Sequence, residues 1–267
     1  MRAIDLAELR SLQLGVLDAI HMYCKENGIK YTLACGTMLG CARHKGYIPW
    51  DDDSDIYMLR NDYNELINNF PEIFNGKIKI VSLERDSKWN RPYAKAYDNR
   101  TVFSEISECR RPIGVNIDIF PIDKVPDNED KWRQYNSVRR ILQNINTLKV
   151  ISFTKNRSFA KNLFLLISKT FLLPISSRTI AKCLQNYSKK YNRHEYKRVF
   201  ENSLGMILKK PFPIALFDEL VEMPFEDRNY YAMKHYEIYL ESAYGNWQEL
   251  PPIEKRITHH AFKAYWK

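Results

Sequence analysis

Four carboxylates stand within five positions of this sequence, at Asp51, Asp52, Asp53 and Asp55. Adjacent negative charges repel one another, so the folded chain needs a cation or hydrogen-bond donors to neutralise them. Carboxylate oxygens are the ligands that hard divalent cations such as Mg²⁺ and Mn²⁺ prefer. The acidic run therefore predicts a metal site.

The pattern around the acids predicts a strand over residues 53–58. Successive side chains of a strand alternate between its two faces, so Asp53 and Asp55 share one face while the apolar side anchors the strand in the core. This geometry presents both carboxylates to one cation. Asp51 and Asp52 precede the strand, and we expect them to cap or orient it.

A third carboxylate lies far along the chain, in the apolar run at residues 115–123. Acids are rarely buried without a partner. The run predicts a strand that brings Asp118 to the same metal; the alternative is a structural Asp held by hydrogen bonds. Asp123, which follows Pro121, is expected in a loop or at a cap.

Several polar residues near these strands are candidates for binding substrate. A glycine followed by a small hydroxyl residue lets the backbone approach a phosphate closely. A lysine on a strand near the acids could hold a phosphate or could simply face solvent. Turn residues after that strand and one of two adjacent histidines complete the set. The candidates are Gly36, Thr37, Arg43, His44, Lys45, Lys95, Asp98 and His260.

The elements that must position these residues follow from apolar periodicity and from turn and cap signals. A helix over 228–244 is expected to begin after Asp227 and to end at Gly245. Further helices are predicted over 6–26, 38–42, 61–70, 130–147, 159–173 and 176–191. Strands are predicted over 29–34, 53–58, 78–83, 93–97 and 115–123. The fold class is therefore a mixture of helices and strands.

The composition excludes several classes of protein. The chain has 267 residues, of which 45% are hydrophobic, enough for a sizeable core and too many for a disordered chain. The first residues lack an uninterrupted apolar run, so no secretory signal and a cytoplasmic location are expected. Five cysteines without a C-x-x-C pair argue against a disulfide framework or a zinc knuckle, and we expect them to be small core residues.

The positive charge is concentrated in one region. Residues 149–210 contain 14 Lys and Arg against two Glu, a local surplus of +12 in a chain whose net charge is +9. Such a block suggests contact with an anionic membrane surface or another polyanion; the alternative is a solvated helical face. Aromatic residues are not interleaved with the charges, so nucleic acid is not expected. The apolar segment at 159–173 could lie in the interface of an anionic leaflet or be buried between helices.

The whole pattern resembles the LicD family, which includes bacterial phosphocholine transferases and relatives of fukutin-related protein. Residues 36–40 and 43–56 match its most specific block. Residues 93–95 with 98–101, residues 117–123 and residues 239–252 also match, as does His260. The resemblance covers about residues 20–260, although the middle region matches only in being helical and basic. One departure is Asn246, where the family often has an acid.

The resemblance implies a nucleotidyltransferase-like mixed sheet flanked by helices, with a basic helical elaboration. It implies one domain over 1–267, made of a core over 1–128, a basic helical region over 129–210 and a C-terminal part over 211–267 that completes the active site.

The activity implied is transfer of a phospho-alcohol, most often phosphocholine from CDP-choline, to a hydroxyl of a surface glycan or its lipid-linked precursor, with release of CMP. Asp53, Asp55 and Asp118 would then be catalytic and hold Mg²⁺ or Mn²⁺, while Arg43, His44 and Lys95 would contact phosphate. The enzyme would work in the cytoplasm, or as a peripheral protein at the inner face of the membrane. The alternatives are nucleotidyl transfer at the α phosphorus of a nucleoside triphosphate, or a regulator without activity that binds glycan or membrane.

Overall fold

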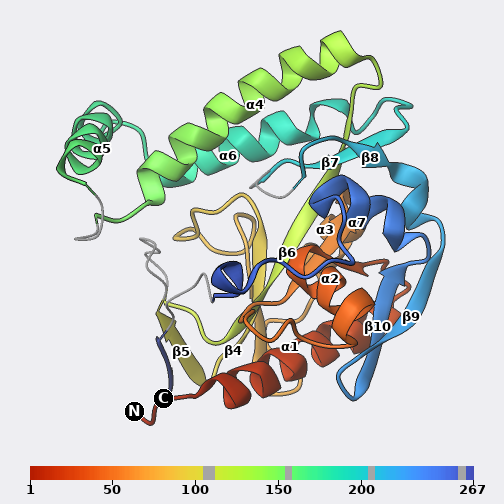
Figure 1. The fold of residues 1–267 in the computed structure, drawn as a ribbon. Helices are drawn as coiled ribbons and strands as arrows, with labels where there is room; N and C mark the ends of the chain where they lie inside the picture. Colours follow the sequence, from red (N-terminus) through yellow and green to blue (C-terminus); the bar gives the residue numbers. More distant parts are fainter. Residues whose placement is uncertain (105–111, 154–157, 204–207, 258–262) are drawn as a thin grey trace.

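The computed structural model describes residues 1–104, 112–153, 158–203, 208–257 and 263–267. Their centre is a seven-stranded mixed sheet (Figure 1), in which β2 and β6 run parallel and the other neighbouring pairs antiparallel. The main path is β1 (Thr32–Leu33), β2 (Asp55–Leu59), β6 (Asn116–Val125), β4 (Ala94–Asp98) and β3 (Ile78–Val81); β7 (Arg198–Glu201) pairs with β6 and β8 (Phe212–Pro213) with β7. The predicted mixed sheet is confirmed.

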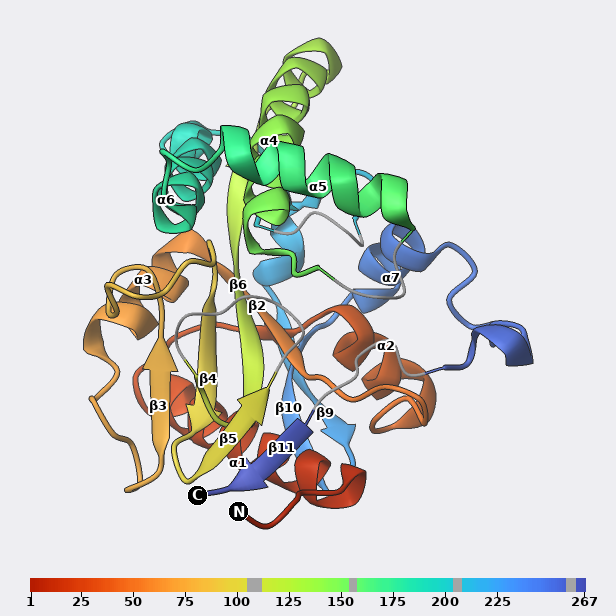
Figure 2. The ribbon, with the colours of Figure 1, turned by 90° about the vertical axis from the view of Figure 1, so that its left-hand side faces the viewer.

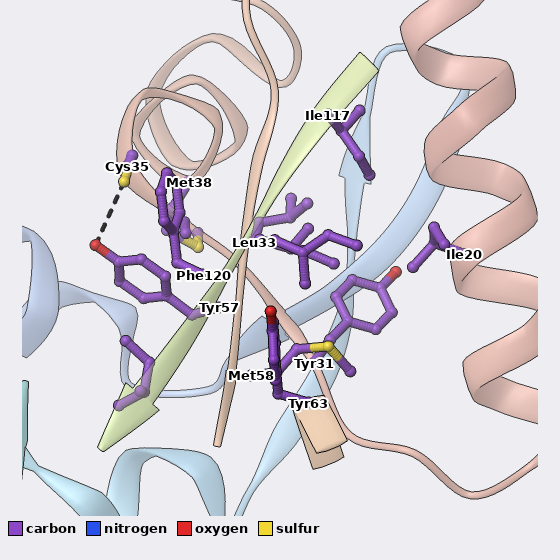
Figure 3. Packing of buried hydrophobic residues seen from close by; sticks show 14 of the residues in the cluster. Ile20, Tyr31, Leu33, Cys35, Met38, Tyr57, Met58, Tyr63, Ile117 and Phe120 are labelled. Atoms are coloured by element: carbon purple, nitrogen blue, oxygen red, sulfur yellow. Dashed lines mark hydrogen bonds between the residues drawn. The ribbon is translucent and has the colours of Figure 1, made fainter. Parts of the chain in front are cut away.

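Helices cover this sheet where the periodicity predicts them. Helix α1 (Leu6–Glu26) has the predicted bounds, because the Asp5 side chain accepts a hydrogen bond from the Glu8 N–H and the chain turns at Gly28, whose φ is +66°. It packs against β4 and β6, whereas α3 (Arg60–Asn69) packs against β2 and β6. The aliphatic and aromatic side chains between them form the main core (Figure 3).

Three helices follow β6 and correspond to the predicted basic helical region. They are α4 (Glu129–Val150), α5 (Phe159–Phe171) and α6 (Ser177–Ser188), the last continued by a short 3-10 turn, η1 (Lys189–Tyr191). Helices α4 and α6 lie side by side at one end of the sheet, and α5 stands to one side of them (Figures 1 and 2). No helix in the described ranges is both long and apolar enough to cross a membrane.

The helix predicted over 228–244 is wrong in its first half. Residues Leu220–Phe225 (β9) and Arg228–Met233 (β10) form an antiparallel hairpin instead, and only α7 (Tyr236–Tyr244) is helical. Burial of Tyr230 and Ala232 follows the two-residue period of a strand. Glu226, with φ +56°, makes the turn of this hairpin, whereas Gly245, with φ +71°, ends α7 as predicted.

The remaining C-terminal elements are short. They are the 3-10 turns η2 (Ile214–Phe217) and η3 (Ile253–Lys255), and β11 (Lys263–Trp266), which pairs with β5 (Thr101–Ser104) to form a small second sheet.

Two further expectations concern single residues. Asp123 was expected in a loop or at a cap, but it lies within β6. Its carboxylate is neutralised there by a buried bidentate ion pair with Arg60, in which Oδ1 lies 2.8 Å from Nε and Oδ2 lies 2.6 Å from Nη2. Cys24, Cys35 and Cys41 are buried as expected. Cys183, however, is exposed on α6, and Cys109 lies outside the described residues.

Candidate active site

The acidic run sits in a loop that α1 holds in place. Arg10 Nη2 donates hydrogen bonds to the carbonyl oxygens of Ile48, at 3.0 Å, and Asp51, at 2.6 Å. Gln13 Nε2 donates to the carbonyl oxygen of Asp52 at 2.9 Å. These side chains fix the backbone that leads into β2, so the carboxylates that follow enter the sheet in one defined register.

Three charged side chains lie in a row across neighbouring strands. Asp55, the first residue of β2, is the register partner of Asp118 on β6, and Asp118 is in turn the partner of Lys95 on β4. Lys95 Nζ lies 2.7 Å from Asp118 Oδ1 and donates to Asn116 Oδ1 at 2.9 Å. The fold therefore brings together two of the predicted acids and the predicted strand lysine.

The electrostatics of Asp55 reflect this crowding. The residue is 7% exposed, and burial raises the pKa of its carboxyl group well above the usual value; the nearby charges of Asp53, Asp118 and Asp51 raise this pKa further. Lys95 opposes this effect. The third predicted ligand, Asp53, is half-buried just before β2 begins. Among the described residues, three carboxyl groups thus lie close to one lysine.

The donor set suits a hard divalent cation, because carboxylate oxygens are the ligands that Mg²⁺ prefers. Among the residues that the structure describes, however, no three His, Cys, Asp or Glu side chains are arranged as a ready-made metal site. A cation held by Asp53, Asp55 and Asp118 would therefore also draw on water or substrate oxygens, as Mg²⁺ commonly does.

The first turn of α2 (Cys35–His44) borders this row. Gly36 and Thr37 lie in this first turn, because the helix is longer than the predicted 38–42. Thr37 Oγ1 accepts a hydrogen bond of 2.8 Å from the Asp55 N–H and so joins the helix to β2. A Cβ atom on Gly36 would collide with the Asp51 carboxylate. The N-terminus of the helix, which is the positive end of its dipole, therefore faces the acidic loop.

Cys35, the first residue of α2, anchors this turn. It has a left-handed backbone conformation, with φ +49°, that L residues other than glycine adopt at a cost. Its N–H donates to Tyr239 Oη at 2.9 Å, and its Sγ lies 3.3 Å from Tyr57 Oη (Figure 3). Burial raises the pKa of both tyrosines well above the usual value, which keeps their hydroxyls neutral. The two tyrosines thus support the bend from which α2 starts.

The predicted basic residues lie at the other end of α2. Arg43, His44 and Lys45 follow Thr37 by six to eight positions, about 9–12 Å along a helix axis. Arg43 Nη1 donates to the carbonyl oxygens of Trp247, at 2.9 Å, and Glu249, at 3.0 Å, and so holds the C-terminal loop. The His44 ring packs edge-on against Trp50, and Lys45 is exposed. The fold does not gather these three beside the Asp55–Asp118–Lys95 row.

Two candidates remain. Asp98 ends β4 three positions after Lys95, so the alternation of the strand places it on the opposite face. There its carboxylate pairs with Arg100, at 2.6 Å from Nη2. The other candidate, His260, lies outside the described residues.

Sequence reasoning missed Asn116 and the two tyrosines. The two-residue period of a strand places Asn116 on the same face as Asp118, and that signal was present in the sequence. Tyr239 accepts a hydrogen bond from the N–H of Cys35, which lies 204 positions earlier in the chain, so no local pattern points to that contact.

The chain is similar in sequence to known proteins. Residues 28–183 match a family model described as LicD/FKTN/FKRP, nucleotidyltransferase domain. The chain is 29% identical over 275 residues to the lipopolysaccharide cholinephosphotransferase LicD of Haemophilus influenzae, with 99% of each chain covered. Two shorter matches are with uncharacterized proteins. The match with the protein of Rickettsia typhi has 33% identity over 88 residues, which is 30% of this chain and 28% of the relative. The match with the protein of Rickettsia prowazekii has 42% identity over 65 residues, which is 24% of each chain.

Proposed function

Since the chain belongs to the LicD/FKTN/FKRP family, we propose that it is a metal-dependent transferase that moves a phospho-alcohol group onto a hydroxyl of a glycan. The group is most simply phosphocholine, because the Haemophilus relative that aligns over 99% of both chains is a lipopolysaccharide cholinephosphotransferase. The observation that carries the proposal is the row of Asp55, Asp118 and Lys95 across three strands beside the N-terminus of α2.

In this proposal CDP-choline is the donor and CMP the leaving group. Asp53, Asp55 and Asp118 would hold Mg²⁺ or Mn²⁺, which when bound neutralises charge on the diphosphate. The N–H groups of Gly36 and Thr37 in the first turn of α2 would hold phosphate oxygens. Lys95, already beside Asp118, would add a positive charge next to the transferred phosphate.

The reaction would form one bond and break another. The oxygen of the glycan hydroxyl would bond to the phosphorus that carries choline, and the bond from that phosphorus to the CMP oxygen would break. Asp118, whose side chain is partly exposed, would accept the proton of the hydroxyl or complete the metal shell. An acceptor attached to lipid would bring the protein to the cytoplasmic face of a membrane. The proposed reaction involves no nucleic acid.

The test is a panel of CDP-alcohols, with choline, ethanolamine, glycerol and ribitol, incubated with the protein, Mg²⁺ and a lipopolysaccharide acceptor. We expect CMP release that depends on both Mg²⁺ and acceptor, and a mass increase of the glycan by one phospho-alcohol. Release of pyrophosphate from a nucleoside triphosphate, with no turnover of any CDP-alcohol, would instead identify a nucleotidyltransferase and refute the proposal.

Matched variants link the activity to the site. Asp53→Asn and Asp55→Asn are expected to lower CMP release at least about a hundredfold while circular dichroism stays unchanged. Asp218→Asn, at an exposed carboxylate after η2, is the control and should retain full activity. Near-normal turnover of well-folded Asp53→Asn and Asp55→Asn proteins would contradict the assignment of the metal site.

A further inference from the structure

Helix α5 presents its apolar side chains to solvent. Of its 13 residues only Leu165 is buried, while Asn162, Ser168 and Lys169 are half-buried. Phe159 and Phe171, at its two ends, are each 81% exposed. We call the exposed apolar residues of this helix and the segment that follows it the α5 apolar face: Phe159, Leu163, Phe164, Leu166, Ile167, Phe171, Leu173 and Ile175.

This arrangement is the reverse of an ordinary surface helix, which buries its apolar stripe and exposes its polar one. The helix packs chiefly against α4 and stands apart from the central sheet (Figures 1 and 2). Contiguous exposed apolar surface is uncommon on soluble proteins and marks a site of interaction.

The segment that contains the α5 apolar face is rich in positive charge. Residues 149–194 contain ten Lys and Arg and no Asp or Glu. Lys161 is exposed on α5 itself. Lys169 Nζ lies 5.4 Å from the centroid of the Phe153 ring. Phe153 is itself an exposed aromatic residue. The surface therefore combines exposed apolar side chains with the exposed cation of Lys161, in a segment whose sequence contains no acidic residue.

We infer that the α5 apolar face docks on an anionic lipid bilayer, with the helix lying in the plane of the interface. Phenylalanine and leucine side chains would enter the boundary between headgroups and acyl chains, while Lys161 and Lys169 would meet lipid phosphates. Thirteen residues span about 20 Å as a helix, too short to cross the bilayer.

The charges also argue against a second copy of this chain as the occupant of the face. A two-fold dimer through α5 would bring the same cations of both copies together, and like charges across an interface oppose association. An anionic membrane surface is complementary to both the apolar and the charged residues.

This inference refines the membrane contact of the proposed function, but its test needs no turnover, so the two can fail separately. The probe is sedimentation with vesicles of phosphatidylcholine alone or of phosphatidylcholine and phosphatidylglycerol in equal amounts. We expect the wild-type protein to bind the anionic vesicles at least about tenfold more tightly than the neutral ones. The double variant Phe164→Glu/Ile167→Glu should lower binding to anionic vesicles by at least about tenfold, because two apolar side chains are lost from the interface.

Two controls separate the contributions. Ile73→Glu changes a residue that is 43% exposed before β3, outside the α5 apolar face, and should bind vesicles as the wild type does. Lys161→Gln/Lys169→Gln should reduce binding to anionic vesicles while leaving weak binding to neutral ones unchanged. The inference is overturned if Phe164→Glu/Ile167→Glu binds like wild type, or if the wild type ignores vesicles and forms a dimer that this variant dissociates.

Discussion

Replacement of Lys95 tests the charge balance of the site directly. The ammonium group lies 2.7 Å from the Asp118 carboxylate, and the two side chains are only 7% and 17% exposed. Breaking a buried ion pair by removing one partner costs about 3–5 kcal/mol, because the other charge stays in a poorly solvated place. Asp118 keeps some contact with water, so we expect Lys95→Met to lower the free energy of unfolding by about 2–4 kcal/mol.

The measurement is urea denaturation followed by tryptophan fluorescence, in a buffer with a chelator that removes divalent cations. The double variant Lys95→Met/Asp118→Asn removes both charges, so it should be more stable than Lys95→Met alone, with a coupling energy of about 1–3 kcal/mol between the two positions. Added Mg²⁺ should restore more stability to Lys95→Met than to wild type, because the variant site is more negative. At a concentration one hundred times the dissociation constant, the gain would be about 2.7 kcal/mol.

Two results would refute this reasoning. If Lys95→Met loses less than about 1 kcal/mol, the pair is screened by solvent to the degree typical of surface pairs. If the two single changes are simply additive in the double variant, Lys95 and Asp118 do not stabilise one another. An equal Mg²⁺ response of wild type and Lys95→Met would show that the added negative charge does not strengthen cation binding.

Two further predictions concern the support of the site and its response to pH. Thr37→Val leaves the Asp55 N–H without the hydroxyl that accepts its hydrogen bond, so the free energy of unfolding should fall by about 1–3 kcal/mol and CMP release should fall about tenfold. The control is Thr37→Ser, which keeps the hydroxyl. Equal losses in both variants would contradict this role of Thr37. Burial lowers the pKa of His21 below its usual value, so the unfolded chain takes up a proton first as the pH falls. The stabilising effect of a neutral His21 is therefore present above about pH 6.5 and lost as the pH falls toward the folded pKa. Urea titrations across this range should show a shallower pH dependence for His21→Gln, and an unchanged dependence would exclude His21 as its source.

Recognition of the family depended chiefly on the most specific block of sequence, which surrounds the acidic run. The match over residues 28–183, and the Haemophilus relative that aligns over 99% of both chains, confirm that recognition. The site roles predicted for Arg43, His44 and Asp98 remain predictions. In the structure Arg43 and Asp98 make contacts with the chain itself, to the Trp247 carbonyl and to Arg100.

The error over residues 228–244 has a specific cause. Residues 228–233 contain Tyr, Ala and Met, which fit the face of a helix as well as a strand. The hairpin is decided by pairing with β9, in register from Arg228 opposite Phe225 to Met233 opposite Leu220, and by the left-handed turn at Glu226. The Glu226 side chain also accepts a hydrogen bond of 2.9 Å from the Tyr47 N–H. The two residues are 179 positions apart, so a pattern of neighbouring residues cannot reveal this contact.

The sequence by itself determined the helix over residues 6–26, the strands that carry Asp55 and Asp118, and the clustering of positive charge, because these depend on local periodicity, caps and composition. Only the tertiary structure decided that Lys95 pairs with Asp118, that the basic end of α2 lies away from them, and that α5 turns its apolar face outward. Those outcomes depend on strand register and on packing between elements distant in sequence, where the contact energy of the whole fold outweighs local preference.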